Sequence, residues 1–476
     1  MKLALALLLN AALLALVLPW LRREWRAAPR PLRRVLLPAL ALRLLVGGLA
    51  SLRLTYDAYL MSKLGHALNQ LLWDFPVWAA QTLRGDSYQL GGWDIVYNGA
   101  NRSLLFASNS FFFSKILLFV NIASGGLDWL NGVYLSLFVF AGSWVLVRTL
   151  AGVLPATPAG AGAVAFLLWP SVVGFASGIT KETLVLGSGA WLLALVVRGL
   201  YGAPGLATVE PGRFGRTLGW TGGVGILLLA LLHFKMRYFF AVPLLAGLAG
   251  LALIRLGQRL GLAQSRLSQV GLLLAVLAVG AGVGPALSPV FRLNKFTGQL
   301  IKIYGHHLST SRDKPHFEYP ALRPTGESAL RHAPQAVWNC LTRPWLGESA
   351  ARPYVAAGLD NLALLTLLAL AAAAAWRGRA GRLPFALGLV LALHCLLLAF
   401  LIGLSTPNLG SLHRYRSGLL PYLLLLLLQN DYAARLLRRA GLGSGPAPPA
   451  NEPGLEGAAR AHSRPQAGLE AVSLPS

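Results

Sequence analysis

The chain has 476 residues, of which 55% are hydrophobic and only 12% are charged, about half the charged fraction of soluble domains, so a soluble globular enzyme is excluded. The 42 Lys and Arg residues outnumber the 17 Asp and Glu residues and give a net charge of +25, which is also typical of nucleic-acid binders. Because the basic residues stand in short clusters between long apolar runs, they indicate membrane topology instead, and we expect no nucleic-acid partner.

Apolar runs long enough to cross a bilayer recur along the chain, since a membrane helix needs about 20 mostly apolar residues. We expect such helices at 3–20, 35–53, 128–149, 159–177, 182–199, 218–234, 238–256, 268–289, 355–375, 384–403 and 417–430. A further run at 103–122 carries Asn109, Ser110, Lys115 and Asn121, and we expect it to lie at the interface or to re-enter. The sequence therefore predicts an all-α fold, a polytopic transmembrane bundle of about 11–12 membrane helices.

Arginine clusters between these runs predict the orientation of the bundle. The first run has no small-residue cleavage site and its positive charges follow it, so we expect an uncleaved helix rather than a signal peptide. The clusters are Arg22 to Arg34, Arg198 to Arg216, Arg255 to Arg266, Arg377 to Arg382 and Arg435 to Arg439. If 103–122 does not span, all of these clusters fall on the same side of the membrane. Because short basic loops stay in the cytoplasm, that side should be the cytoplasmic one. We expect a multi-pass protein of the bacterial inner membrane, with its N-terminus outside and its C-terminus in the cytoplasm.

The same pattern divides the chain into three parts. Residues 1–34 are expected to form a membrane anchor with a basic cytoplasmic loop, and residues 35–430 a polytopic membrane domain. Residues 431–476, whose end is rich in Gly, Pro and Ala, are expected to be a disordered cytoplasmic tail. Two outer segments, 54–102 and 291–353, are long, and most of the acidic residues lie in or beside outer segments. We therefore expect any chemistry to face outward.

The first outer segment begins with an amphipathic pattern. Asp57 stands at helical spacing from Met61, Leu64, Leu68 and Leu71, which predicts a helix along the membrane surface. Partial desolvation there would suit the carboxylate of Asp57 to proton abstraction. The alternative is that Asp57 only caps or solvates the start of the helix.

Basic side chains also recur at the outer ends of later helices. The candidate binding residues are Lys181 and Glu182, Lys235 and Arg237 in HFKMRYFF, Arg343 and Glu348 in LTRPWLGES, and His413, Arg414 and Arg416. Each basic group could simply anchor its helix by reaching toward water. Together they lie on the side that should be poor in basic residues, which favours a shared anionic ligand such as a lipid phosphate or pyrophosphate.

A stretch of the second long segment, GHHLSTSRDKPHFEYP, contains several residue types that bind metals. His306, His307, Asp313, His316 and Glu318 are suitable ligand types, but their spacing matches no metal motif. The Ser, Thr and Pro among them indicate a flexible segment. We expect no cofactor and no metal, with a divalent ion as the alternative.

The layout resembles the GT-C superfamily of polyprenyl-phosphate-sugar glycosyltransferases: a polytopic bundle, an acidic early outer loop with in-plane helices, and a late outer loop. The stretches WPSVVGFASGITKE (169–182) and RPWLGE (343–348) are similar to segments of envelope-polysaccharide membrane proteins. The resemblance implies a polyprenyl-phosphate-linked sugar donor used at the outer face, in cell-envelope polysaccharide or glycoconjugate synthesis.

The resemblance also implies a role for Asp57, because an acid of the first outer loop serves as base or metal ligand in that superfamily. The superfamily usually has paired acids there, whereas Ala58 follows Asp57 in this chain. Asp74, Asp86 or Asp94 could take the role instead.

Two other functions compete with this one. The O-antigen polymerase and ligase families are also similar, with outward arginines that grip a lipid pyrophosphate, and there no single acid need be essential. A lipid or solute transporter is the third alternative. Transporters usually show internal repeats and bind near the bilayer midplane, whereas this chain shows no repeat and its notable charges cluster at one surface, apart from Arg43 inside a predicted helix.

Overall fold

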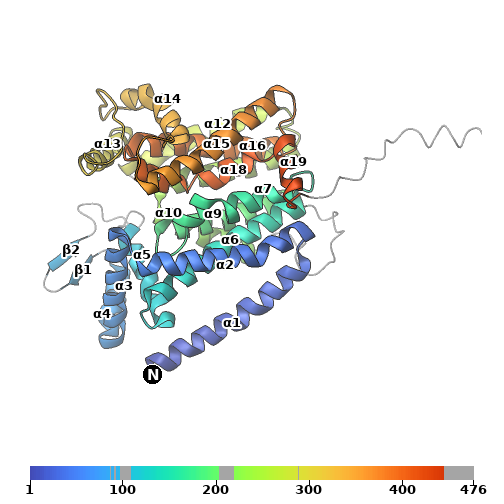
Figure 1. The fold of residues 1–476 in the computed structure, drawn as a ribbon. Coiled ribbons are helices and arrows are strands. Elements are labelled where there is room, and N and C mark those ends of the chain that lie inside the picture. The colour runs from blue at the N-terminus through green and yellow to red at the C-terminus, as the bar shows by residue number, and fades with distance from the viewer. Residues whose placement is uncertain (86, 91–92, 97–108, 203–218, 288, 444–476) are drawn as a thin grey trace, which may run out of the picture.

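The computed structural model describes residues 1–85, 87–90, 93–96, 109–202, 219–287 and 289–443. In these ranges the chain is an all-α bundle of long helices that run side by side (Figure 1). Its described strands, β1 (Ser87–Leu90) and β2 (Trp93–Val96), pair in a short antiparallel hairpin.

Within the described ranges, eight helices are long and apolar enough to cross a membrane, which confirms the predicted polytopic fold. They are α1 (Lys2–Ala27), α2 (Arg30–Leu52), α6 (Asp128–Val153), α9 (Lys181–Tyr201), α11 (Tyr238–Arg259), α12 (Arg266–Leu287), α15 (Arg352–Trp376) and α16 (Phe385–Ser405). Shorter apolar helices accompany them, including α5 (Asn109–Ser124) and α10 (Trp220–Met236).

Two predicted membrane runs are not single helices. The run 159–177 divides into α7 (Ala159–Ala163), a π-helical turn (Val164–Leu168) and α8 (Pro170–Phe175), because Pro170 has no N–H to continue the helix. The run 417–430 contains only α18 (Leu420–Leu427).

The tail predicted to be disordered from residue 431 begins instead as a helix, α19 (Asp431–Arg439). The side chain of Asn430 accepts hydrogen bonds from the backbone N–H groups of Tyr432 and Ala433, which caps the first turn of α19. Asn430 thus starts an ordered helix where composition predicted disorder, and residues 444–476 lie outside the described ranges.

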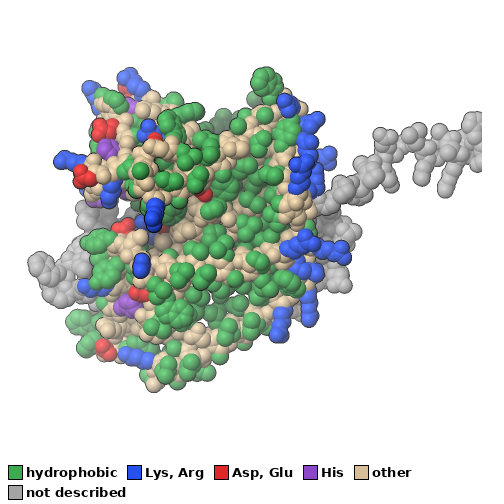
Figure 2. Space-filling model, viewed as in Figure 1, with side chains coloured by type: hydrophobic (Ala, Val, Ile, Leu, Met, Phe, Trp, Pro, Cys, Tyr) green, Lys and Arg blue, Asp and Glu red, His purple; other side chains and the backbone are tan. Residues whose placement is uncertain are grey.

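Charge divides the two ends of the bundle (Figure 2). At one end, to the right in the view, Lys and Arg side chains gather almost without acids. The α1–α2 junction and α19 lie there, and Arg377 at the end of α15 donates to Tyr432 Oη over 3.0 Å. We call this the arginine-rich end. The opposite end carries acids and histidines beside its basic residues, and we call it the mixed-charge end.

Helices of the two long segments lie at the mixed-charge end (Figure 1). In the first segment, α3 (Tyr56–Asp74) and α4 (Pro76–Arg84) run across the ends of the bundle helices, as expected for helices along a membrane surface. Met61, Leu64 and Leu68 are buried, which confirms the predicted apolar stripe of α3. The second segment supplies α13 (Leu293–Ser309) and α14 (Gly326–Thr342).

Helix α5 starts and finishes at the mixed-charge end. Asn109 and Ser110, its first residues, accept hydrogen bonds from Lys181 at the start of α9. Asp128, which opens α6 just after α5, is bonded to Ser62 and His66 of α3. Because α6 and α9 run in the same direction, with Gly178 bonded to Ser136 near their starts and Gly142 packed on Trp191 further along, α5 does not cross the bundle.

Arg43, the charged residue inside α2, has a structural role. Its guanidinium is fully buried and donates to the carbonyl oxygens of Phe166 (2.8 Å), Val172 (3.1 Å) and Ala176 (3.0 Å). These carbonyls belong to the interrupted stretch around Pro170, where regular helical hydrogen bonding is broken. Arg43 therefore fixes the backbone that leads to the start of α9.

Candidate functional site

A sharp turn precedes α9, which begins at the mixed-charge end. Gly178 has φ +78, a left-handed conformation that favours glycine. The side chain of Thr180 then caps α9 by accepting a hydrogen bond from Thr183 N–H. The next two residues, Lys181 and Glu182, form the first turn of the helix, where a carboxylate is favoured by the helix dipole.

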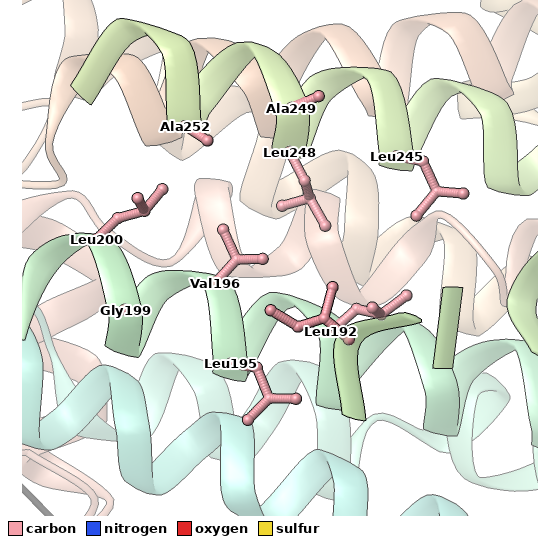
Figure 3. Close-up of a pocket in the computed structure, with 10 residues that line it drawn as sticks. Leu192, Leu195, Val196, Gly199, Leu200, Leu245, Leu248, Ala249 and Ala252 are labelled. Atoms are coloured by element: carbon pink, nitrogen blue, oxygen red, sulfur yellow. The ribbon is translucent and has the colours of Figure 1, made fainter. Parts of the chain in front are cut away.

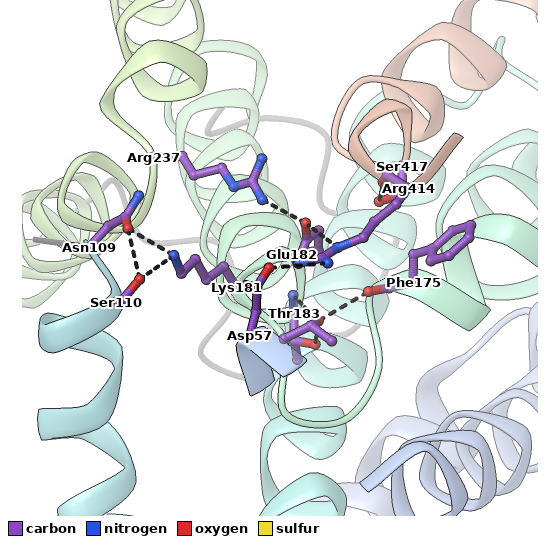
Figure 4. Close-up of polar contacts among 11 residues, drawn as sticks. Asp57, Asn109, Ser110, Phe175, Lys181, Glu182, Thr183, Arg237, Arg414 and Ser417 are labelled. Carbon is purple, nitrogen blue, oxygen red and sulfur yellow. Dashed lines mark hydrogen bonds and ion pairs between the residues drawn. The ribbon is translucent and has the colours of Figure 1, made fainter. Parts of the chain in front are cut away.

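Glu182 is the centre of the site (Figure 4). Its side chain is only 2% exposed, and Oε1 accepts from Arg237 Nη2 over 2.6 Å and from Arg414 Nε over 3.1 Å. A carboxylate buried this deeply needs charged partners. Arg237 follows α10, and Arg414 lies in α17 (Leu409–Arg416), so Glu182 binds three segments together.

Asp57 enters the site from α3. Its Oδ2 lies 3.8 Å from Arg414 Nη1, on the side of the guanidinium not used by Glu182. The Asp57 side chain is 63% exposed, so the partial desolvation expected from the sequence is not found. The reason is its position in the first turn of α3, where the buried stripe begins only with Ala58 and Met61. An exposed carboxylate is accessible to a ligand.

Lys181 approaches from the other side. Its Nζ donates to Asn109 Oδ1 over 2.8 Å and to Ser110 Oγ over 2.7 Å, both at the start of α5 (Figure 4). These partners are neutral, so they orient the ammonium group without cancelling its charge. Sequence reasoning treated Asn109 and Ser110 only as polar residues of a weak apolar run.

An aromatic surface lies against the two arginines. The guanidinium of Arg237 is 4.4 Å from the ring centre of Tyr415, and that of Arg414 is 5.6 Å from it. The ring of His307, from α13, packs edge-on against Tyr415 at 6.0 Å. Burial lowers the pKa of His307, and the charge of Arg237 and Arg414 acts in the same direction. His307, predicted only as a possible metal ligand, is thus a neutral neighbour of the site.

We call Asp57, Lys181, Glu182, Arg237 and Arg414 the Glu182 cluster. The structure brings these five predicted site residues together from α3, α9, the junction of α10 and α11, and α17, segments far apart in the sequence. The three basic side chains and two carboxylates leave one net positive charge. Such a site can hold a singly charged phosphate through guanidinium and ammonium donors.

His413 and Arg416 belong to a different, structural unit. Arg416 is fully buried, and its Nη1 donates to Asn361 Oδ1 (2.7 Å) and to the carbonyl oxygen of Arg343 (2.9 Å). Its Nη2 lies 3.1 Å from His413 Nδ1. Burial, together with the charge of Arg416, lowers the pKa of His413 to about 3, so its imidazole is neutral. Arg416 thus holds α17 against α14, through the carbonyl oxygen of Cys340, and against α15, through Asn361. The ring of His413 packs edge-on against Phe175 of α8, with 5.2 Å between the ring centres.

Arg343 and Glu348 form a pair of their own outside the Glu182 cluster. Arg343 Nε pairs with Glu348 Oε1 over 3.3 Å, and its guanidinium lies 5.2 Å from the ring centre of Trp345. Lys235 is half-buried in the last turn of α10. Among the substitutes for Asp57, Asp74 is at the far end of α3, about 25 Å along the helix. Residue 86 and the side chain of residue 94 lie outside what the structure describes.

Metal ligands do not converge in the part of the chain that the structure describes. No group of three His, Cys, Asp or Glu side chains there could hold a metal ion. His316 and Glu318, two of the considered ligands, pair with each other over 3.4 Å.

Comparison with known proteins gives no relative. No protein-family model matches the chain, and neither a curated protein nor a solved structure is significantly similar to it.

Proposed function

We propose that the protein is an integral-membrane glycosyltransferase that uses a polyprenyl-phosphate-linked sugar. The observation that carries the proposal is the pairing of Asp57 with Arg414 inside the Glu182 cluster. An exposed carboxylate beside side chains able to bind a phosphate supports this proposal, since moving a sugar from a phosphate to a hydroxyl group needs both.

The net charge of the cluster supports a monophosphate-linked donor. A sugar on a polyprenyl phosphate is a phosphodiester with a single negative charge, whereas a pyrophosphate-linked sugar carries a further charge. Glu182 is 2% exposed and held by both arginines, so it stays in place and neutralises part of their charge. The single remaining positive charge matches the phosphodiester better.

The proposed reaction assigns a task to each side chain. Asp57 takes the proton of the acceptor hydroxyl as its oxygen bonds to the anomeric carbon of the sugar. The bond from that carbon to the phosphate oxygen breaks, and its electron pair leaves with the polyprenyl phosphate. Lys181, Arg237 and Arg414 stabilise the additional negative charge that develops on the phosphate.

We also propose that the mixed-charge end faces the outside of a bacterial inner membrane, in cell-envelope polysaccharide or glycoconjugate synthesis. The arginine-rich end fits the cytoplasmic side by the rule that basic loops stay inside. Reporter fusions test this orientation. A phosphatase fused at the N-terminus should be active and one fused after residue 443 inactive; the opposite pattern would reject it.

A specific observation also favours the second candidate, a polymerase or ligase acting on lipid-pyrophosphate oligosaccharide. The only exposed carboxylate of the cluster, Asp57, is itself close to an arginine, so the exposed face has more donors than acids. In that case transfer requires Arg237 and Arg414, and no single acid.

The deciding experiment is transfer of labelled sugar from polyprenyl phosphate and from polyprenyl pyrophosphate by the purified protein in nanodiscs. Asp57→Asn should abolish transfer without loss of folding, and Asp313→Asn, an exposed acid in the second segment, should leave it unchanged. Full activity of Asp57→Asn with loss in Arg414→Gln would support the second candidate. Absence of transfer from either donor would reject both.

A further inference from the structure

A groove opens between α9, α10 and α11 (Figure 3). It has a volume of about 440 Å³. Leu192, Val196 and Leu200 of α9 form one wall, and Leu245, Leu248 and Ala252 of α11 form the other. The lining is apolar, and the volume is within the range of small-molecule pockets, about 300–1,000 Å³.

The groove is open to the surroundings of the bundle rather than enclosed. Leu192 is fully buried and Leu248 is 5% exposed, so these two residues form the deepest parts of the two walls. Gly199 and Ala249 are exposed, and their small side chains leave the mouth unobstructed. In a membrane, such an opening faces the hydrocarbon chains of lipids.

The groove extends toward the arginine-rich end. Leu192 is about 15 Å along α9 from Glu182, and Leu200 is a further 12 Å or so toward the end of the helix. Arg255 closes this end of the groove: its Nη2 donates to the carbonyl oxygen of Leu200 over 3.3 Å, and its guanidinium lies 4.4 Å from the ring centre of Tyr201.

Positive charge surrounds the same end. Arg198 precedes the lining residue Gly199, and Arg259 lies one helical turn beyond Arg255 on α11. Apart from Glu182 at the opposite end, α9, α10 and α11 contain no acidic residue. An apolar groove that ends under three arginines is complementary to a molecule with a hydrocarbon chain and an anionic head.

We propose that this groove binds an anionic phospholipid, with one acyl chain between α9 and α11 and the phosphate near Arg198, Arg255 and Arg259. Basic clusters at a membrane surface attract anionic headgroups. Zwitterionic lipids offer the same chain without net negative charge, so the arginines should select the anionic class. The proposal does not depend on the sugar-transfer function.

Native mass spectrometry of the full chain tests the proposal. The detergent-purified protein is mixed with phosphatidylglycerol or with phosphatidylcholine of the same chain length. We expect phosphatidylglycerol to bind on the order of a hundredfold more tightly, since each of the three arginines contributes about a factor of five. Equal binding of the two lipids would overturn the proposal. Full displacement of phosphatidylglycerol by soluble glycerol phosphate would also overturn it, because the site would then bind an anion without binding an acyl chain.

Variants separate the headgroup from the chain. Arg198→Gln with Arg259→Gln should remove the preference for phosphatidylglycerol. Arg377→Gln with Arg382→Gln, which both follow α15 at the same end, should keep this preference. Ala252→Trp fills the groove and should weaken the binding of both phosphatidylglycerol and phosphatidylcholine. Unchanged lipid binding in Ala252→Trp would overturn the proposal.

Residues 203–218 follow α9 in the chain and are the competing occupant. A photo-crosslinking residue at position 252 should attach to added phosphatidylglycerol. Attachment to the peptide 203–218 instead would show that the chain fills its own groove and would overturn the proposal.

Discussion

The guanidinium of Arg43 donates to the carbonyl oxygen of Phe166 over 2.8 Å, the acceptor that Pro170 leaves without its helical partner. In a regular helix, Phe166 would accept from the N–H of residue 170, and proline has none. An arginine that is fully buried in α2 thus replaces a backbone hydrogen bond in a neighbouring segment.

Replacing Arg43 by Met should therefore destabilise the protein by about 3 kcal/mol or more, because several buried carbonyls lose a donor at once. Thermal unfolding in detergent measures the change. In a Pro170→Ala background the same replacement should cost less, since an alanine N–H can serve Phe166. If replacing Arg43 by Met destabilised the protein equally with and without Pro170, Arg43 would not act by compensating for the hydrogen bond that the proline lacks.

Glu182→Gln should cost about 3 kcal/mol, because it leaves Arg237 and Arg414 facing each other without the shared carboxylate. Glu327→Gln is the matched control: its partner Arg331 is in the same helix and both are largely exposed, so the change should be within about 0.5 kcal/mol. Chemical unfolding of both variants makes the comparison. A Glu182→Gln variant as stable as the control would mean that the cluster contributes nothing to the fold.

Two arginines of α17 should respond differently to replacement. Arg416→Leu should prevent stable folding, because it leaves the carbonyl of Arg343 and the side chain of Asn361 without their donor. Arg414→Gln should fold and should lose affinity for soluble phosphodiesters. Size-exclusion profiles and binding isotherms report the two properties separately. Loss of folding in Arg414→Gln with normal folding of Arg416→Leu would reverse these assignments.

His413 predicts a loss of stability in acid. Its pKa falls from an ordinary value near 6.5 when unfolded to about 3 when folded, so only the unfolded chain takes up its proton between these values. Stability from this group is complete above pH 6.5 and falls by up to about 1.4 kcal/mol per pH unit below it. Unfolding of wild type and His413→Gln between pH 7 and 5 isolates this contribution. Parallel pH profiles for the two proteins would exclude it.

The course of the bundle could be predicted from the sequence, because long apolar runs and arginine clusters are strong local signals. The predicted runs correspond to helices along most of the chain. Pro170 indicates from the sequence that the helix is interrupted there. The form of the interruption, a π-helical turn bonded to Arg43, could not be predicted, because Arg43 belongs to a helix more than a hundred residues earlier.

The candidate site could be predicted only in part. Lys181, Arg237 and Arg414 are predicted because they are basic on the side expected to be poor in basic residues, and together with Glu182 they do meet. Arg414 and Arg416 could not be told apart, since they are two residues apart in one short helix and differ only in what each side of that helix contacts. The contacts of Tyr415 and His307 with the site could not be predicted, because a local sequence pattern does not indicate tertiary contacts.

Helix α5 returns to the end of the bundle from which it starts, so it does not set the direction of any later helix. During biosynthesis, α6 can therefore be oriented by its own sequence before α5 has found its place. A lengthened or shortened segment between α3 and α6 would leave the remaining membrane helices with unchanged polarity.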